Sequence, residues 1–351
     1  MKKILALTLA LCMVFALCAC GSTSDSSSAS SAAAAPADSS SSDASDASDT
    51  AVSDVSADLT VGTGGESGTY YGYTGVLSTV VGQKTNVMLN VVATGGSKDN
   101  LVSMQEGMYD LATVQSDVMT YAYNGTNSFA DSGAIDSFRV LCALYPETIQ
   151  IVTTDSSLTS IEDLKGKSVC VGDVGSGTYF NAVDVFAAYD MTMDDITPVY
   201  QSFGDSAESL KDGKIDAAFV SAGAPTPAIA ELATSKTVSL ISIDDEHMEK
   251  LLADCPWYAE ITLPAGTYDG FDEDCTTITV KATLVCTADL DDDVAYTIVK
   301  TIMESKDDIA ALHEKGNYID LSFATEGIAV PFAKGAAEYF AENGITVDTV
   351  D

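Results

Sequence analysis

Two glycine-rich turns carry the residue types and spacing best suited to holding a small ligand. One spans residues 62–65 (Gly-Thr-Gly-Gly) and the other residues 175–178 (Gly-Ser-Gly-Thr). Each lies between an apolar run typical of a strand and a stretch typical of a helix, so its backbone amides lie near a helix N-terminus. Unsatisfied amides and the helix dipole attract anions at such a place. Each turn could therefore hold a carboxylate without a cationic side chain.

Polar and aromatic side chains beside these turns would orient a ligand and enclose it. The ligand-binding residues predicted from the sequence are Thr63, Gly64, Gly65, Thr69, Tyr70, Tyr71, Thr94, Gly95, Gly96, Ser97, Gln115, Ser116, Asp117, Ser176, Gly177, Thr178, Tyr179, Ser221, Ala222 and Gly223. The three tyrosines would either form walls of the cleft or belong to the core. Asp117 would either bind a ligand ammonium or cap the helix that begins beside it.

Sequence patterns that would indicate a catalytic site are incomplete in this chain. Ser67 stands where a dinucleotide fingerprint needs its third glycine, and the sequence contains no complete Gly-x-x-x-x-Gly-Lys-Ser/Thr phosphate loop. Residues 65–69 miss the nucleophile-elbow pattern because they end in threonine. The two histidines, His247 and His313, lie in acidic stretches typical of solvated helices. We therefore expect no catalytic residues, no cofactor and no metal site.

Strand and helix patterns alternate along the chain, which indicates an α/β architecture. Three apolar runs in each half end in polar turns that begin helices. These runs are residues 59–61, 87–93 and 110–114, and then 168–171, 197–201 and 216–220. Each half thus carries a similar βαβαβ unit, and open α/β sheets bind ligands beyond the carboxyl ends of their strands.

Two long extended runs, residues 137–155 and 277–287, flank the second unit and are long enough to cross between two lobes. The chain is also longer than one hydrophobic core usually supports. We therefore predict two α/β lobes joined by hinge strands, with the ligand cleft between them. The predicted boundaries give lobe I residues 58–148 and 258–351, and lobe II residues 149–257.

The N-terminal segment has the pattern of a lipoprotein leader. Lys2 and Lys3 precede an apolar run at residues 4–17, and the Leu-Cys-Ala-Cys-Gly junction that follows looks like a bacterial lipobox. Cleavage of residues 1–19 would leave Cys20 as a lipidated N-terminus. The rest of the segment 20–57 is almost wholly Ser, Ala and Asp, a composition typical of a disordered linker. An ordinary secretory signal with an incidental cysteine is the alternative.

The formal net charge of −36 limits the classes of partner. Such a surface repels nucleic acid and anionic lipid headgroups, so we expect neither as a partner. It also repels anionic solutes at long range, so a carboxylate must be held by local donors inside the cleft. Because Arg139 is the only arginine, an arginine clamp would have to come from that residue.

The cysteines that follow Cys20 do not form a metal-binding pattern. They are Cys142, Cys170, Cys255, Cys275 and Cys286. An odd number cannot all pair within one chain, and no CxxC spacing indicates zinc. Buried free thiols are the favoured interpretation, although a Cys255–Cys275 or Cys275–Cys286 bridge stays open.

These segments resemble the TAXI receptors, the solute-binding subunits of one branch of the tripartite ATP-independent periplasmic (TRAP) transporters. The matching stretches follow the order of that family, at residues 62–65 with 68–71, 94–101, 115–117, 175–178, 216–219 with 223–226, and 263–268. One stretch departs from the family. Its frequent Pro-Leu-His-Pro-Gly-Ala is Pro-Phe-Ala-Lys-Gly-Ala at residues 331–336, so any contact made by that histidine is absent.

The resemblance implies a class II periplasmic-binding-protein fold and a ligand that is a glutamate- or glutamine-like amino acid or another small carboxylate. It also implies delivery of this solute to a TRAP-type membrane permease subunit. We expect a monomer that is extracytoplasmic, lipid-anchored to the outer face of the cell membrane, and not an enzyme. The acidity of the chain keeps a neutral, zwitterionic or cation-assisted ligand open. A binding protein that presents its solute to a membrane sensor is the alternative function, and a secreted hydrolase is a weaker one.

Overall fold

The structure, a computed structural model, describes residues 54–350. The predicted leader, the lipidated Cys20 and nearly all of the predicted linker lie outside these residues. None of the described helices is both long and apolar enough to cross a membrane.

The strands of the described chain form one mixed sheet in the order β2-β1-β3-β10-β4-β7-β5-β6, with β8 paired to β4 and β9 paired to β10. They are β1 (Ser56–Gly62), β2 (Asn86–Val92), β3 (Leu111–Gln115), β4 (Phe138–Thr153), β5 (Ser168–Cys170), β6 (Thr197–Val199), β7 (Ala217–Ala222), β8 (Ser239–Leu240), β9 (Ala259–Leu263) and β10 (Cys275–Thr287). β1 is parallel to β2 and β3, and β5 is parallel to β6 and β7. Both predicted βαβαβ units are therefore present, one at each end of the strand order.

Helices follow most of these strands. The first unit contains α1 (Thr69–Lys84), α2 (Ser97–Gln105) and α3 (Ser116–Asn124), and the second contains α4 (Thr178–Ala188), α5 (Phe203–Lys211), α6 (Pro227–Ala233) and α7 (Asp245–Asp254). After β10 come α8 (Asp292–Glu304), α9 (Lys306–Leu312), the 3-10 helix η4 (Glu314–Tyr318), α10 (Leu321–Thr325) and α11 (Lys334–Glu342). Because α1, α2, α4 and α5 follow parallel strands, their N-termini lie at the carboxyl ends of those strands, where ligands bind in such sheets.

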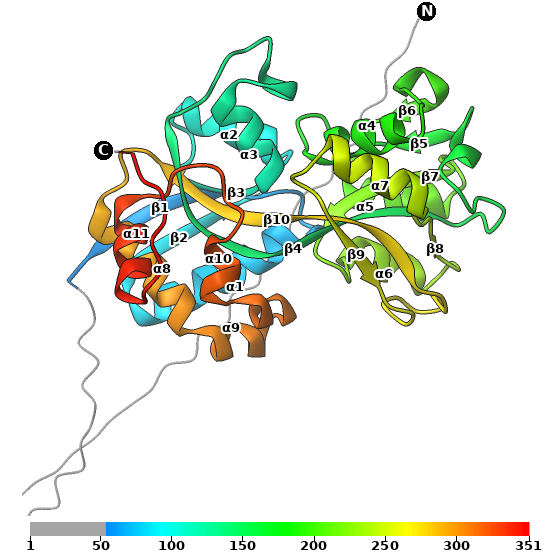
Figure 1. The fold of residues 1–351 in the computed structure, drawn as a ribbon. Coiled ribbons are helices and arrows are strands. Elements are labelled where there is room, and N and C mark those ends of the chain that lie inside the picture. Colours follow the sequence, from blue (N-terminus) through cyan, green and yellow to red (C-terminus); the bar gives the residue numbers. More distant parts are fainter. Residues whose placement is uncertain (1–53, 351) are drawn as a thin grey trace, which may run out of the picture. The chain divides into compact units, whose positions relative to one another are not determined.

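The strands β4 and β10 belong to both halves of the molecule (Figure 1). They pair antiparallel with each other, from Phe138 opposite Thr287 to Thr148 opposite Thr279. The first part of β10 pairs with β9 and its last part pairs with β3, while the last part of β4 pairs with β7. The predicted fold class, two α/β lobes joined by hinge strands, is confirmed.

Buried apolar residues form three clusters that define the lobes. The first cluster combines residues between 59 and 145 with residues between 282 and 340, and it is the core of the first lobe. The other two contain residues between 149 and 280. On β7, Phe219 belongs to the second cluster while Ala218 and Val220 belong to the third. Since successive strand residues point to opposite faces, these two clusters cover the two faces of the second lobe's sheet.

The clusters indicate where the chain returns from the second lobe to the first. The boundary predicted from the sequence was residue 258. From that point on, buried residues still pack within the second lobe: Tyr258 and Ile278 belong to the second cluster, and Leu263 and Cys275 to the third. We therefore propose the return near residue 281, within β10. A continuous strand carries no sequence signal for the point where its packing partner changes.

The five cysteines of the described chain are free and buried. Buried free thiols were the favoured interpretation of the sequence, and neither of the two bridges left open there is formed. Burial raises the pKa of Cys142 to about 12, so this thiol is protonated and unreactive at neutral pH.

Replacing Tyr268 by phenylalanine should destabilise the second lobe by about 2 kcal/mol, because two buried groups would lose their partners. The Tyr268 hydroxyl accepts a hydrogen bond from the Thr226 amide at 2.8 Å and donates one to Gln150 Oε1. Urea unfolding measures this loss. Tyr200→Phe, at an exposed ring, serves as the control, and an equal effect of both changes would contradict the prediction.

Candidate ligand-binding site

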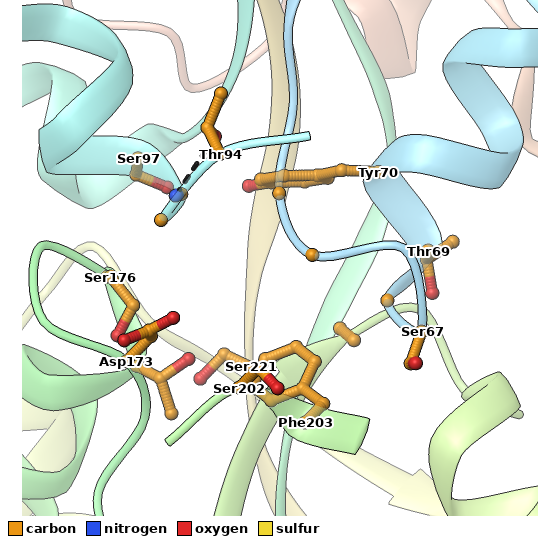
Figure 2. A pocket seen from close by; sticks show the side chains of 18 of the residues that line it. Ser67, Thr69, Tyr70, Thr94, Ser97, Asp173, Ser176, Ser202, Phe203 and Ser221 are labelled. Carbon is orange, nitrogen blue, oxygen red and sulfur yellow. Dashed lines mark hydrogen bonds between the residues drawn. The ribbon is translucent and has the colours of Figure 1, made fainter. Parts of the chain in front are cut away.

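A cavity lies between the lobes, beyond the carboxyl ends of the parallel strands. It contains about 640 Å³ of space free of protein atoms, part of it open to solvent. Its lining residues are Gly64, Gly65, Glu66, Ser67, Gly68, Thr69, Tyr70, Thr94, Gly95, Gly96, Ser97, Gln115, Glu147, Asp173, Ser176, Gly177, Thr178, Ser202, Phe203, Gly204, Ser221 and Ala222. Figure 2 shows Tyr70, Thr94 and Ser97 of the first lobe facing Asp173, Ser176 and Ser221 of the second across this space.

The first glycine turn supplies free backbone donors to the cavity. Gly64 and Gly65 line it, and among the described residues neither amide has a hydrogen-bond acceptor. Helix α1 begins four residues beyond Gly65, at Thr69, so the glycine turn and the first turn of this helix together border the space. Amides in such a position can hold an anionic or a neutral acceptor oxygen.

The second glycine turn reaches the same cavity. Ser176, Gly177 and Thr178 line it, and Thr178 begins helix α4. The structure thus brings the two predicted turns, which are far apart in the sequence, to one space. Each lobe contributes a strand-to-helix turn of the same kind.

One helix N-terminus is already occupied by protein. The amides of Lys98 and Asp99, in the first turn of α2, donate to the carbonyl oxygen of Gly175 at 3.0 and 3.1 Å. Within the turn before α2, the amides of Gly95 and Gly96 donate to Asp99 Oδ2 and Thr94 Oγ1. These amides are therefore engaged within the protein. The Gly95–Gly96 turn contributes a wall to the cavity, and its two amides are not free donors.

Several predicted site residues do not line the cavity; they are Thr63, Tyr71, Ser116, Asp117, Tyr179 and Gly223. The Thr63 hydroxyl donates to the Val92 carbonyl at 2.7 Å, beneath the first turn. The Gly223 carbonyl accepts from Thr69 Oγ1 at 3.0 Å. Both residues are adjacent in sequence to residues that line the cavity, but their own side chains and backbone do not line it.

The remaining displaced residues have other partners. Ser116 Oγ accepts a hydrogen bond from the Lys281 amide at 3.1 Å. Tyr71 follows Tyr70 in α1, and adjacent helical residues point in different directions, so only Tyr70 faces the cavity. Tyr179 lies in a separate surface hollow, where its ring is near those of Phe180 and Tyr200.

Arg139 does not reach the cavity. Its guanidinium donates to the carbonyl oxygens of Asp136 and Phe138 at 2.8 and 2.7 Å, at the start of β4. An arginine clamp on the ligand is therefore absent from this site. The lining contains neither lysine nor histidine.

Direct contacts join the lobes beside the cavity. Besides the Thr69 bond to Gly223, Lys315 Nζ of η4 donates to the carbonyl of Ala224 in the same loop of the second lobe. Lys315 is only 4% exposed, so this contact is largely shielded from water. The structure is therefore that of closed lobes.

Asn181 of α4 connects several buried groups across the lobe boundary. Its Oδ1 accepts from Gln115 Nε2 at 2.8 Å and from Ser221 Oγ at 2.7 Å. Its amide nitrogen donates to Asp117 Oδ2 at 3.0 Å and to the Tyr258 hydroxyl at 2.8 Å. Gln115 and Asp117 belong to the first lobe, so the two hydrogen bonds to these residues form only when the lobes are closed.

Glu147 of β4 is the fully buried acidic residue of the cavity lining, with 2% of its surface exposed. The Tyr70 hydroxyl donates to its Oε2 at 2.6 Å. Burial raises the pKa of this carboxyl well above its usual range; the hydrogen bond from Tyr70 opposes the shift and the charge of Asp117 adds to it. Glu66 and Asp173 are more exposed members of the same lining.

Sequence reasoning missed part of the lining. The missed residues are Glu66, Ser67, Gly68, Glu147, Asp173, Ser202, Phe203 and Gly204. A signal for two of these positions was present. Glu147 is a lone acidic residue in a long apolar strand, and Ser202 begins a polar turn that follows a strand of the second unit, as the predicted turns do.

Solved structures similar to this chain share little of its sequence. Similar solved structures include the alkanesulfonate-binding protein SsuA from Xanthomonas axonopodis pv. citri, at 16% identity and a TM-score of 0.48, covering 82% of this chain and 91% of that one. A protein from Bordetella bronchiseptica RB50 has 15% identity, coverages of 81% and 89%, and a TM-score of 0.49. The periplasmic aliphatic sulphonate binding protein SsuA from Escherichia coli has 14% identity, coverages of 84% and 82%, and a TM-score of 0.44.

The amino-acid sequence matches the model of a protein family over most of both lobes. The match covers residues 61–344, from the last residues of β1 to the end of α11, and so includes both lobes and both glycine turns. The chain belongs to the NMT1-like family.

Proposed function

We propose that this protein is an extracytoplasmic solute-binding protein that captures a small carboxylate or amino acid for a TRAP-type secondary transporter. One observation carries the proposal: a cavity between two closed lobes is lined from both sides by strand-to-helix turns. A ligand in this space would be enclosed by groups of both lobes, so binding and lobe closure would favour each other.

The lining favours binding over catalysis. It supplies hydroxyl groups, backbone amides and carboxylates, while His247 and His313 both lie outside it. A serine or threonine nucleophile needs a base within hydrogen-bond reach, and no histidine or lysine lines the space to act as one. Membership of the NMT1-like family fits a binding role.

The delivery step is the more specific part of the proposal. The resemblance of the glycine turns to TAXI receptors supports a TRAP-type permease subunit as the partner. The lipobox-like junction ending in Cys20 supports a lipid anchor on the outer face of the cell membrane. The Ser/Ala/Asp segment after it would let the folded part reach the permease, as a flexible tether does.

Ligand-dependent melting tests the proposal. The protein, incubated with amino acids and small dicarboxylates at millimolar concentration, should show a raised melting temperature with at least one of them, because a ligand that binds only the folded state stabilises it. Absence of a shift with every compound would overturn the ligand assignment. Turnover of generic ester substrates would favour a hydrolase instead.

A further inference from the structure

The charge of the cavity lining is one-sided. Three carboxylates, those of Glu66, Glu147 and Asp173, line the space, and no lysine, arginine or histidine does. Exposed carboxylates at a cavity mouth are hydrated and need no explanation. Glu147 is different because it is only 2% exposed and lies at the wall of the space.

The hydrogen bonds of Glu147 leave one side of its carboxylate without a partner. Tyr70 donates to Oε2 at 2.6 Å, and no described residue donates to Oε1 or forms an ion pair with the group. Burying an ionised carboxylate without a cation costs free energy, so the group stays ionised only when enough hydrogen-bond donors or a positive charge contact it. Accordingly, burial raises the pKa of Glu147 well above its usual range in the protein alone.

The rest of the cavity defines what else the ligand must contain. The free amides of Gly64 and Gly65 suit an acceptor oxygen, either a carboxylate or a neutral carbonyl. When Glu147 is ionised, a second negative charge in the same cavity needs a cation to offset the repulsion, because like charges in a poorly solvated site repel strongly. A dicarboxylate is therefore disfavoured on electrostatic grounds.

We infer that the solute carries a cationic nitrogen with N–H donors, a protonated amine or a guanidinium, that binds Glu147, and that its net charge is zero or positive. This inference rests on the solute-binding function proposed above and narrows it. The Tyr70 hydroxyl holds the carboxylate in position, and the ligand cation takes the place of the missing protein cation. Tyr70 is accordingly a positioning residue for Glu147.

The test is calorimetric binding to compounds that differ in charge. The panel contains the neutral and basic protein amino acids, γ-aminobutyrate, putrescine and agmatine. They are compared with L-glutamate and L-aspartate, whose net charge is negative, and with L-lactate, succinate, malate and glutarate, which lack a cationic nitrogen. We expect the tightest binding by a member of the first group. In Glu147→Gln, which keeps the shape but removes the charge, affinity for the best of these should fall about tenfold or more. Glu260→Gln, at an exposed glutamate of β9 outside the cavity, is the matched control and should leave affinity unchanged.

The outcomes separate this inference from the proposed function. Tighter binding by glutamate, aspartate, succinate, malate, glutarate or lactate than by every neutral or basic amine would overturn the inference and leave solute binding intact. Unchanged amine affinity in Glu147→Gln would overturn the role of Glu147. No binding by any member, with a melting temperature that none of them alters, would overturn the proposed ligand class itself. Glu147→Gln should fold, because the amide keeps the shape of the carboxyl group and its oxygen can accept the Tyr70 hydrogen bond. Its melting temperature checks this.

Discussion

Replacing Gly177 by alanine should lower the affinity of the protein for its solute about 100-fold, while each lobe keeps its fold. Gly177 precedes α4 with φ −70° and ψ −27°, a conformation that alanine adopts readily. The new methyl group would, however, lie 1.7 Å from Gln115 Oε1 and 2.5 Å from its Cδ. Gln115 belongs to the other lobe, so the overlap arises only when the lobes close.

The size of this effect follows from the surroundings of Gln115. Its side chain is buried and hydrogen-bonded to Asn181, so it cannot turn aside without losing that bond. Val118 Cγ2, 3.0 Å from the new methyl position, limits a shift of the backbone. Overpacking of this kind costs about 1–3 kcal/mol, and the upper end corresponds to about a 100-fold loss of affinity.

Two control variants make the Gly177 experiment specific. Gly72→Ala, in α1 where no atom lies within 4 Å of the added methyl group, should leave affinity unchanged. In a background that carries Gln115→Ala, the Gly177→Ala change should cost less than it does in the native protein, because the main obstruction is gone. Calorimetry with the best ligand of the panel and X-ray scattering, which reports lobe closure, provide the measurements. Native affinity in Gly177→Ala would mean that the closed arrangement is not the binding state.

The free energy of unfolding should fall as the pH rises from about 4 to 7, and Asp117→Asn should remove much of this fall. Asp117 is fully buried, and Oδ1 of its carboxylate has no partner. Burial raises its pKa from 3.8 to about 7; hydrogen bonds from Val118 and Asn181 oppose the shift, and the charge of Asp184 adds to it. The sequence offered Asp117 as a ligand contact, and the structure places it behind the cavity wall.

The sign follows from proton linkage. Between about pH 4 and 7 the folded protein keeps the Asp117 proton, and the unfolded chain has lost it. The folded state therefore binds more protons, and its stability decreases as the pH rises through this window. Burial also raises the pKa of Asp184 to about 6, which acts in the same direction. The rise of the Asp117 pKa from 3.8 to about 7 sets an upper limit of about 4 kcal/mol for the contribution of this group.

Urea unfolding at several pH values measures this dependence. Asp117→Asn keeps the shape and the acceptor for Asn181, so it should unfold with a flatter pH profile and be more stable than the native protein at pH 8. Asp131→Asn, at an exposed loop aspartate, is the matched control and should leave the slope unchanged. An unchanged slope in Asp117→Asn would show that other groups take up the proton.

The sequence identified the parts of the molecule that local patterns encode. Alternation of apolar runs with helical stretches predicted both βαβαβ units, and the length of two extended runs predicted the hinge strands β4 and β10. The glycine turns were recognisable because a chain that passes from strand to helix needs small residues and leaves amides free. These features depend on neighbours in the sequence, so they could be predicted without coordinates.

The chemistry inside the cavity was decided by the tertiary structure. Tyr70 meets Glu147, 77 positions away, and Gln115 meets Asn181, 66 positions away, and no local pattern predicts either pair. The same holds for Asp117, which does not line the cavity, and for the return point that we propose within β10. Lobe packing fixes which polar groups face each other across a gap. The sequence by itself therefore determined that two glycine turns border a cleft, and only the folded lobes determined which charges that cleft contains.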